Sequence, residues 1–68
     1  MNSKLIKKYK KIVTLNKVIK RLSELFIVIH DEGEKGNINI HDWDELQEKI
    51  LIVFVSANGL RKSILDDM

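Results

Sequence analysis

The sequence predicts an all-α fold, an antiparallel helical hairpin that dimerises into a four-helix bundle. Two long stretches carry apolar residues at steps of three and four, and one glycine- and asparagine-rich segment joins them, which predicts the hairpin. Apolar residues outside these two seams predict the association of two hairpins. With 68 residues and no cysteine, the chain is expected to be one small domain, 1–68, that gains stability from association and not from disulfides.

The first helix is expected over about residues 4–30. Its seam consists of the residues Ile12, Leu15, Ile19, Leu22, Phe26 and Ile29. The pattern is weaker before Ile12, because Lys8 occupies the preceding seam position. Residues 1–13 are therefore interpreted either as a mobile basic arm or as a separate short helix.

A loop over 31–41 and a second helix over about 42–58 are expected next. The loop holds two of the three glycines, and Asp42 with Glu45 resembles a capping box at the start of the helix. The second seam consists of the residues Trp43, Leu46, Ile50, Val53, Ala57, Leu60 and Ile64. Asn58-Gly59 resembles a helix C-cap, so residues 60–67 are expected to form a short C-terminal helix or a kinked continuation.

Each helix is apolar on more than its seam. The additional apolar residues are Val18, Leu25, Ile27, Val28, Leu51, Ile52, Phe54 and Val55. Because one hairpin covers only one stripe of each helix, we expect a homodimer. The expected dimer or partner interface comprises Leu22, Leu25, Phe26, Ile29, Trp43, Leu46, Ile50, Val53 and Phe54.

Two other folds compete with this interpretation. The β-branched stretches 25–29 and 50–55 are typical of strands, but each lies inside a longer helical pattern. A three-helix monomer in which residues 60–67 fold back as a lid is the other alternative.

The charge is divided between two parts of the chain. The net charge is only +2, but residues 1–21 hold eight basic side chains and no acid, whereas the remainder holds ten acids against four basic side chains. This division favours an antiparallel dimer, in which basic and acidic ends meet, over a parallel dimer. A parallel dimer would gather its basic ends and require a polyanion.

The sequence contains no pattern typical of an enzyme or a cofactor site. None of its serines has a histidine three or four residues away in helical register, and the sequence lacks a phosphate-binding glycine loop. Residues 31–42 look like an EF-hand loop, but Gly33 and Lys35 replace oxygen ligands, so we interpret the segment as a turn with Gly36 at a positive φ. His30 and His41 are too few for a stable metal site and are expected to be cap or surface residues.

The favoured functional hypothesis is a non-enzymatic regulatory or adaptor protein that binds another protein through apolar helical surface. The alternative is a nucleic-acid-binding regulator that contacts phosphates through its basic N-terminal helix. The basic residues concerned are Lys4, Lys7, Lys8, Lys10, Lys11, Lys17, Lys20 and Arg21.

Contact with a membrane surface is a further, less favoured alternative. In that case Leu5, Ile6, Tyr9 and Ile12 would insert into the lipid. The longest apolar run, 50–55, has only six residues, so no transmembrane segment is expected. The absence of cysteine and of a secretory leader pattern leads us to expect a cytoplasmic protein.

Overall fold

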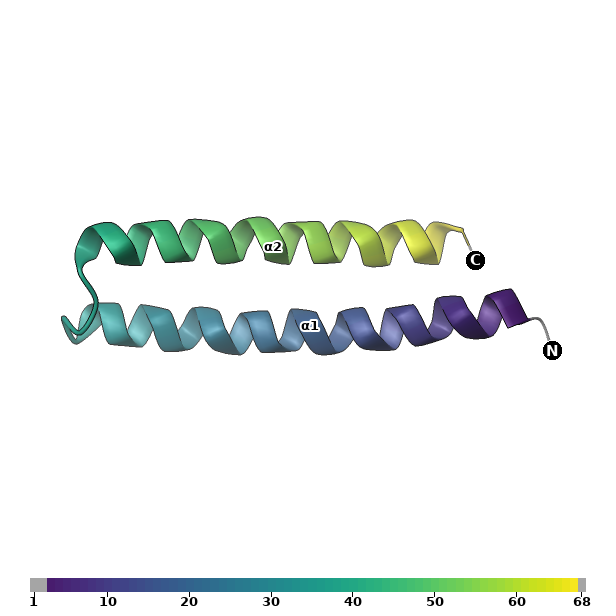
Figure 1. Cartoon of the computed structure of the whole chain (residues 1–68), viewed down its shortest axis with the longest axis horizontal. Coiled ribbons are helices and arrows are strands. Elements are labelled where there is room, and N and C mark those ends of the chain that lie inside the picture. Colours follow the sequence, from purple (N-terminus) through teal and green to yellow (C-terminus); the bar gives the residue numbers. More distant parts are fainter. Residues whose placement is uncertain (1–2, 68) are drawn as a thin grey trace.

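The computed structural model describes residues 3–67, which form two antiparallel α-helices joined by a short loop (Figure 1). Helix α1 spans Ser3–Glu34 and helix α2 spans Ile40–Asp66. The Cα atoms extend 53 Å along the rod but only 14 and 11 Å across it. The predicted all-α hairpin is confirmed, and its dimerisation stays a prediction.

Helix α1 is continuous from Ser3, so the basic residues up to position 13 belong to the same helix as the seam. The predicted seam is confirmed, because its first five members are half-buried and Ile29 is buried against α2. Residues 25–29, for which a strand was the competing interpretation, are helical, as are residues 50–55. The apolar spacing of three and four residues outweighs the local β-propensity there.

The predicted loop was too long at its N-terminal side. Helix α1 continues to Glu34, and Gly36, with φ of 78°, provides the left-handed residue that ends it. Two backbone hydrogen bonds close the turn, from Asn37 N–H to the Glu32 carbonyl at 3.0 Å and from Gly36 N–H to the Gly33 carbonyl at 3.1 Å. This is the Schellman arrangement of a helix C-terminus, and it confirms the expected positive φ of Gly36. The stretch 31–34 is helical, so the twelve-residue loop of an EF-hand is not formed.

The predicted start of the second helix was also wrong. The N-cap of α2 is Asn39, whose side-chain oxygen accepts a hydrogen bond of 2.8 Å from the His41 N–H. Asp42 lies at the third helical position, where an acid complements the helix dipole. Asparagine and aspartate are equally good N-caps, and Asn39 and Asp42 both lie near the start of the helix.

Helix α2 does not end at Asn58-Gly59, so the separate helix 60–67 and the three-helix alternative are both wrong. The Asn58 side chain instead donates to the Phe54 carbonyl of its own helix, at 2.9 Å. Glycine inside a helix costs only about 1 kcal/mol, which packing of Ala57 and Ile64 against α1 can offset.

The seam of α2 is rotated relative to the prediction. Trp43, Ile50, Ala57 and Ile64 face α1 as expected, but Leu46, Val53 and Leu60 are 40%, 49% and 58% exposed. The side chains that take their places beside α1 are Gln47, Phe54 and Arg61, which are half-buried. Both stripes have the same spacing, and the pattern favoured the wrong one because Leu46, Val53 and Leu60 are all apolar.

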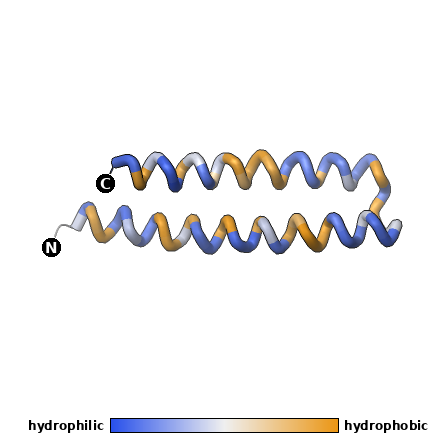
Figure 2. The backbone as a smooth tube through the Cα atoms, turned by 180° about the vertical axis from the view of Figure 1, so that it is seen from behind, coloured by the Kyte–Doolittle hydropathy of each residue, from blue (hydrophilic) through white to orange (hydrophobic). Residues whose placement is uncertain are grey.

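The core that results is small. Among the described residues only Ile29, Ile50 and Ala57 are buried. Figure 2 shows the longest apolar stretch of α2 at mid-length of the rod, where it runs beside α1. Neither helix holds an apolar window long enough to cross a lipid bilayer within residues 3–67.

Candidate protein interface

The groove between the helices has two edges that differ in chemistry. We call one the polar edge; it consists of Asn16, Ser23 and His30 of α1 and Gln47, Phe54 and Arg61 of α2. We call the other the apolar edge; it consists of Val18 and Leu25 of α1 and Leu46, Val53 and Leu60 of α2. Each set repeats every seven residues, which places its members on one side of their helix.

The polar edge is tied across the groove at two levels. Arg61 donates to Asn16 of the opposite helix at 2.8 Å and to Asn58 of its own helix at 2.9 Å. Nearer the loop, the Gln47 amide lies 3.5 Å from the His30 Nδ1. The polar side chains of this edge are thus paired with one another within a single chain.

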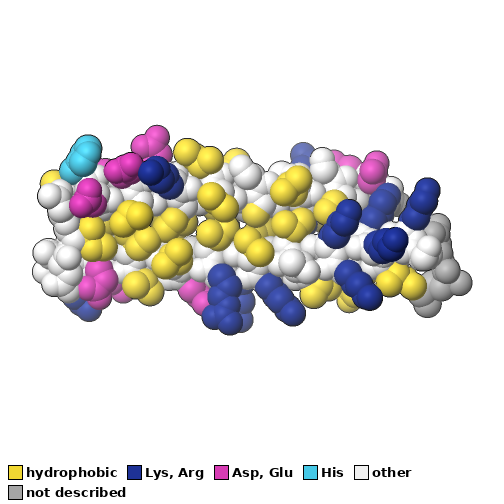
Figure 3. Space-filling view, in the orientation of Figure 1, with side chains coloured by type: hydrophobic (Ala, Val, Ile, Leu, Met, Phe, Trp, Pro, Cys, Tyr) yellow, Lys and Arg dark blue, Asp and Glu magenta, His cyan; other side chains and the backbone are white. Residues whose placement is uncertain are grey.

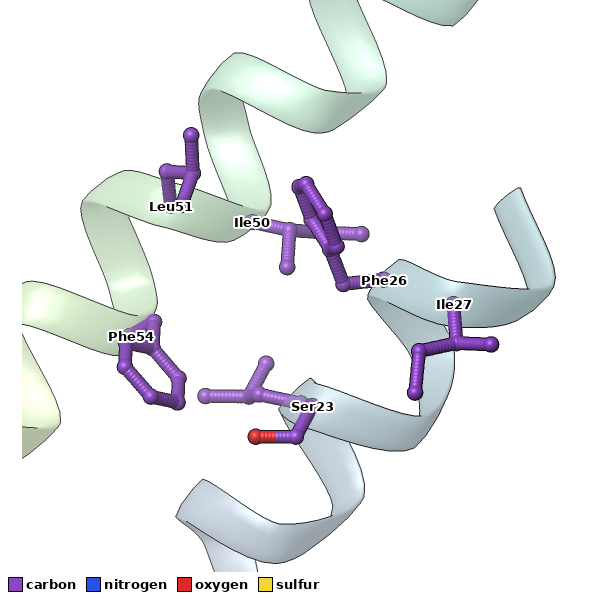
Figure 4. A pocket seen from close by; sticks show the side chains of 7 residues that line it. Ser23, Phe26, Ile27, Ile50, Leu51 and Phe54 are labelled. Carbon is purple, nitrogen blue, oxygen red and sulfur yellow. The ribbon is translucent and has the colours of Figure 1, made fainter. Parts of the chain in front are cut away.

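Between these two ties the polar edge has a hollow of about 250 Å³. Figure 4 shows Phe26 and Ile27 of α1 and Ile50, Leu51 and Phe54 of α2 around it. The lining is apolar except at Ser23, whose small side chain leaves the space open. A hollow of this size accepts one large apolar side chain.

The apolar edge has no comparable closure in its middle. Val18, Leu25 and Val53 are 39%, 47% and 49% exposed. The face seen in Figure 3 carries apolar side chains along the groove over its loop-proximal half and middle, with lysine and arginine side chains around its terminal end. At that end Lys8 reaches the Asp67 carbonyl at 3.2 Å and its carboxylate at 3.8 Å.

The structure separates the nine residues predicted for an interface into two groups. Leu25, Leu46 and Val53 lie exposed on the apolar edge. The remaining six are buried or half-buried within the hairpin itself: Leu22, Phe26, Ile29, Trp43, Ile50 and Phe54. Leu22, Phe26, Ile50 and Phe54 of this second group also line the hollow.

The eight basic residues predicted as phosphate contacts lie on one continuous helix. Seven of them are exposed and Lys8 is half-buried. Arg21 lies 3.6 Å from Glu24 in an exposed ion pair of the same helix. The structure thus presents a basic helical segment at the terminal end of the rod.

The loop end contains a contact that the sequence analysis missed. Gly33 leaves no room for a side chain, because an added Cβ would overlap the Trp43 indole. Trp43 also packs against His30, with ring centroids 5.8 Å apart, and its indole Nε1 is buried without a hydrogen-bond partner. A signal was present, since Gly33 continues the seven-residue spacing of Ile19 and Phe26.

The two histidines do not form a common site. His30 Nε2 lies 3.1 Å from the Glu34 carboxylate oxygen Oε1. His41 instead donates its backbone N–H to the side chain of Asn39, the N-cap of α2. Residues 3–67 contain no group of three or more side chains of the metal-binding types that is placed to hold an ion.

On the loop side of the apolar edge, Glu45 and Lys49 form an exposed ion pair of 2.9 Å. The hydrogen bond from the Lys49 ammonium to the Glu45 carboxylate, together with the attraction of that charge, raises the pKa of Lys49 above its usual 10.5. Lys49 is therefore a cation at all physiological pH values.

Comparisons of the chain with protein families, with curated proteins and with solved structures find no match. The functional argument therefore rests on the surface of the hairpin.

Proposed function

We propose that this chain is a non-enzymatic adaptor or regulatory protein that self-associates and binds another protein through the apolar surface of its hairpin. One observation carries the proposal: the hairpin leaves too much apolar surface in water. Sixteen large hydrophobic residues of the described chain are exposed, against three buried residues in its core.

The total exposed surface is also larger than that of a compact protein of the same mass. The accessible surface of the chain is 5485 Å². A compact monomer of 7.9 kDa exposes roughly 4,400 Å². The difference of roughly 1,100 Å² is similar to the 800 Å² or so that each partner buries in a stable protein complex. One further hairpin is enough to cover an area of this size.

Sedimentation equilibrium at micromolar concentration tests self-association. We expect a mass of twice 7.9 kDa, with helical circular dichroism that falls as dilution separates the subunits. A helical species of 7.9 kDa at all micromolar concentrations would contradict the proposal.

The hollow on the polar edge supports the second half of the proposal, a protein partner. It offers an apolar lining between two polar ties, which suits one bulky side chain of a partner helix. The uncharged dye Nile red is a suitable probe for it. We expect the dimer to bind the dye and Ser23→Phe, which fills the hollow, to abolish that binding.

The control for this experiment is Ser63→Phe, because Ser63 is also exposed but lies near the terminal end of α2. Binding in this variant should equal that of the unmodified chain. Equal binding in both variants, or none in the unmodified dimer, would contradict a partner site at the hollow.

Binding of nucleic acid is a second candidate, supported by the eight basic residues on one helical segment at the end of the rod. Such binding would neutralise backbone phosphates and fall steeply with salt. Titration with generic duplex DNA and RNA tests it. No retention at about 50 mM salt would exclude this candidate.

A further inference from the structure

The charges of α1 oppose its own helix dipole. Its first turn lacks an acid and contains Lys4, whereas its last turn lacks a base and contains Asp31, Glu32 and Glu34. A helix prefers the reverse arrangement by a few tenths of a kcal/mol for each charge. The arrangement thus costs stability in a single hairpin, and an interaction outside the hairpin can offset that cost.

The whole rod shows the same division. Residues 3–21 hold eight basic side chains and no acid, while residues 22–56 hold eight acids and two lysines. Because the helices are antiparallel, both parts of 22–56 lie toward the loop end (Figure 1). One end of the rod is therefore strongly positive and the other strongly negative. Two such rods attract when they lie antiparallel and repel when they lie parallel.

The apolar edge is the side that a second rod would cover. The polar edge already has cross-helix ties, whereas Val18, Leu25 and Val53 lie open on the apolar edge. Buried apolar area supplies the affinity of a dimer, and charge at the rim selects its orientation.

We propose that a second copy of this chain packs antiparallel on the apolar edge, so that Lys17, Lys20 and Arg21 of each α1 lie level with the acidic loop end of the other subunit. This inference rests on the self-association proposed above and specifies its edge and its orientation. The two-fold axis passes near Leu25 and Val53, at the middle of the apolar edge. The hollow on the polar edge stays accessible on the outside of the dimer.

The edge is tested by a matched pair of substitutions. Val53 and Leu51 are two residues apart in α2 and are both 49% exposed, but Val53 lies on the apolar edge and Leu51 lines the hollow. We expect Val53→Glu to raise the dimer dissociation constant at least about 100-fold, because a two-fold dimer buries the new charge twice. Leu51→Glu should change it less than about threefold, because its charge stays in water.

Spin labels test the same edge without disturbing the interface. The chain has no cysteine, so a single substitution gives a single labelling site. Ser56 and Ser23 are both exposed near mid-length of the rod, with Ser56 three residues from Val53 and Ser23 on the polar edge. In pulsed electron paramagnetic resonance of the dimers, we expect a shorter label distance for Ser56→Cys than for Ser23→Cys.

A label near the end of the rod tests orientation. In α1, eighteen residues separate Lys7 from Leu25, which is about 27 Å of helix. Labels in the Lys7→Cys dimer should therefore lie about 50 Å apart if the subunits are antiparallel. In a parallel dimer they would lie within about 25 Å, because packed helix axes are only about 8–10 Å apart.

The outcomes separate this inference from the proposed function. A monomer in sedimentation contradicts self-association and with it this inference. A dimer in which Ser23 labels are closer than Ser56 labels, or in which Lys7 labels lie close together, keeps self-association and overturns the proposed edge or orientation. If both glutamate variants unfold, the label distances decide.

Discussion

The two edges of the groove are formed by the same two helices, but their chemistry differs. On the polar edge, Arg61 and Asn16 meet across 45 residues of sequence, and Gln47 meets His30. On the apolar edge, branched aliphatic side chains project into water. The comparison shows that polar pairs join the two helices on one edge and leave an apolar hollow between them. The aliphatic side chains of the apolar edge lose their contact with water only when another molecule covers them.

The largest effect on stability should come from the buried core between the two edges. Ile50 is 9% exposed and lies between them, so Ile50→Ala should lower the free energy of unfolding by about 2–4 kcal/mol. This is similar to the whole stability of a core of this size, about 3–5 kcal/mol. Circular dichroism should show a largely unfolded chain.

Ile40→Ala is the control for this substitution, since Ile40 is 73% exposed at the start of α2. Its thermal transition should stay close to that of the unmodified chain. If Ile50→Ala unfolds no more readily than Ile40→Ala, Ile50 is not a core residue between the two edges.

The next effect concerns the loop end, where the groove closes. Gly33→Ala should destabilise the hairpin by about 1–2 kcal/mol, because the new methyl group displaces the Trp43 indole. Denaturant unfolding measures the loss of stability, and a red shift of Trp43 fluorescence reports the displaced indole.

Gly59→Ala is the matched control, because nothing lies within 4 Å of its added Cβ and alanine favours the helix by up to about 1 kcal/mol. Two substitutions of the same kind should therefore have opposite signs, and equal signs would contradict the packing of Trp43 on Gly33.

A smaller effect is expected at the polar edge. Arg61→Ala removes the donor of two hydrogen bonds and should cost about 0.5–1.5 kcal/mol of unfolding free energy, with the dimer unchanged in sedimentation. Lys62→Ala, one residue away and exposed, should have almost no effect on stability. Dissociation of the dimer by Arg61→Ala would show that the polar edge belongs to the interface.

The smallest effect is expected at the exposed pair of Lys49 and Glu45. The pKa of Lys49 is raised in the folded chain, so its contribution to stability is complete below its usual 10.5 and is lost as the pH rises through the raised value. The melting temperature of the unmodified chain should exceed that of Glu45→Gln slightly at about pH 9, and the gap should close at higher pH. A gap that widens with pH would contradict the direction of the shift.

Much of the fold was predictable from local patterns. The seam of α1 was predicted correctly because all its members are large apolar residues at heptad spacing. The helix ends were predicted less well, since Gly33 and Gly36 are both possible ends, as are Asn39 and Asp42 possible caps. Only the closing hydrogen bonds of the turn distinguish them.

The nine residues predicted for the interface separated into exposed and buried groups for a physical reason. Spacing alone allowed either of two stripes of α2 to face α1. The stripe of Leu46, Val53 and Leu60 was predicted because all its members are apolar, whereas Phe54 is the only apolar member of the other. In the structure Phe54 faces α1, while Val53 stays exposed. The tie between Arg61 and Asn16 had no sequence signal, because polar residues far apart in the chain have no fixed spacing.

The order of residues by itself determined two amphipathic helices, a single turn between them, opposite charges at the two ends of the rod, and more apolar surface than one pair of helices can bury. These properties depend on spacing and composition, which are local. Only the tertiary structure decided the rotation of α2 about its axis, and with it the difference between a polar and an apolar edge. That rotation depends on how side chains of the two helices fit together, because Trp43 against Gly33 and Arg61 against Asn16 meet only after the chain has folded.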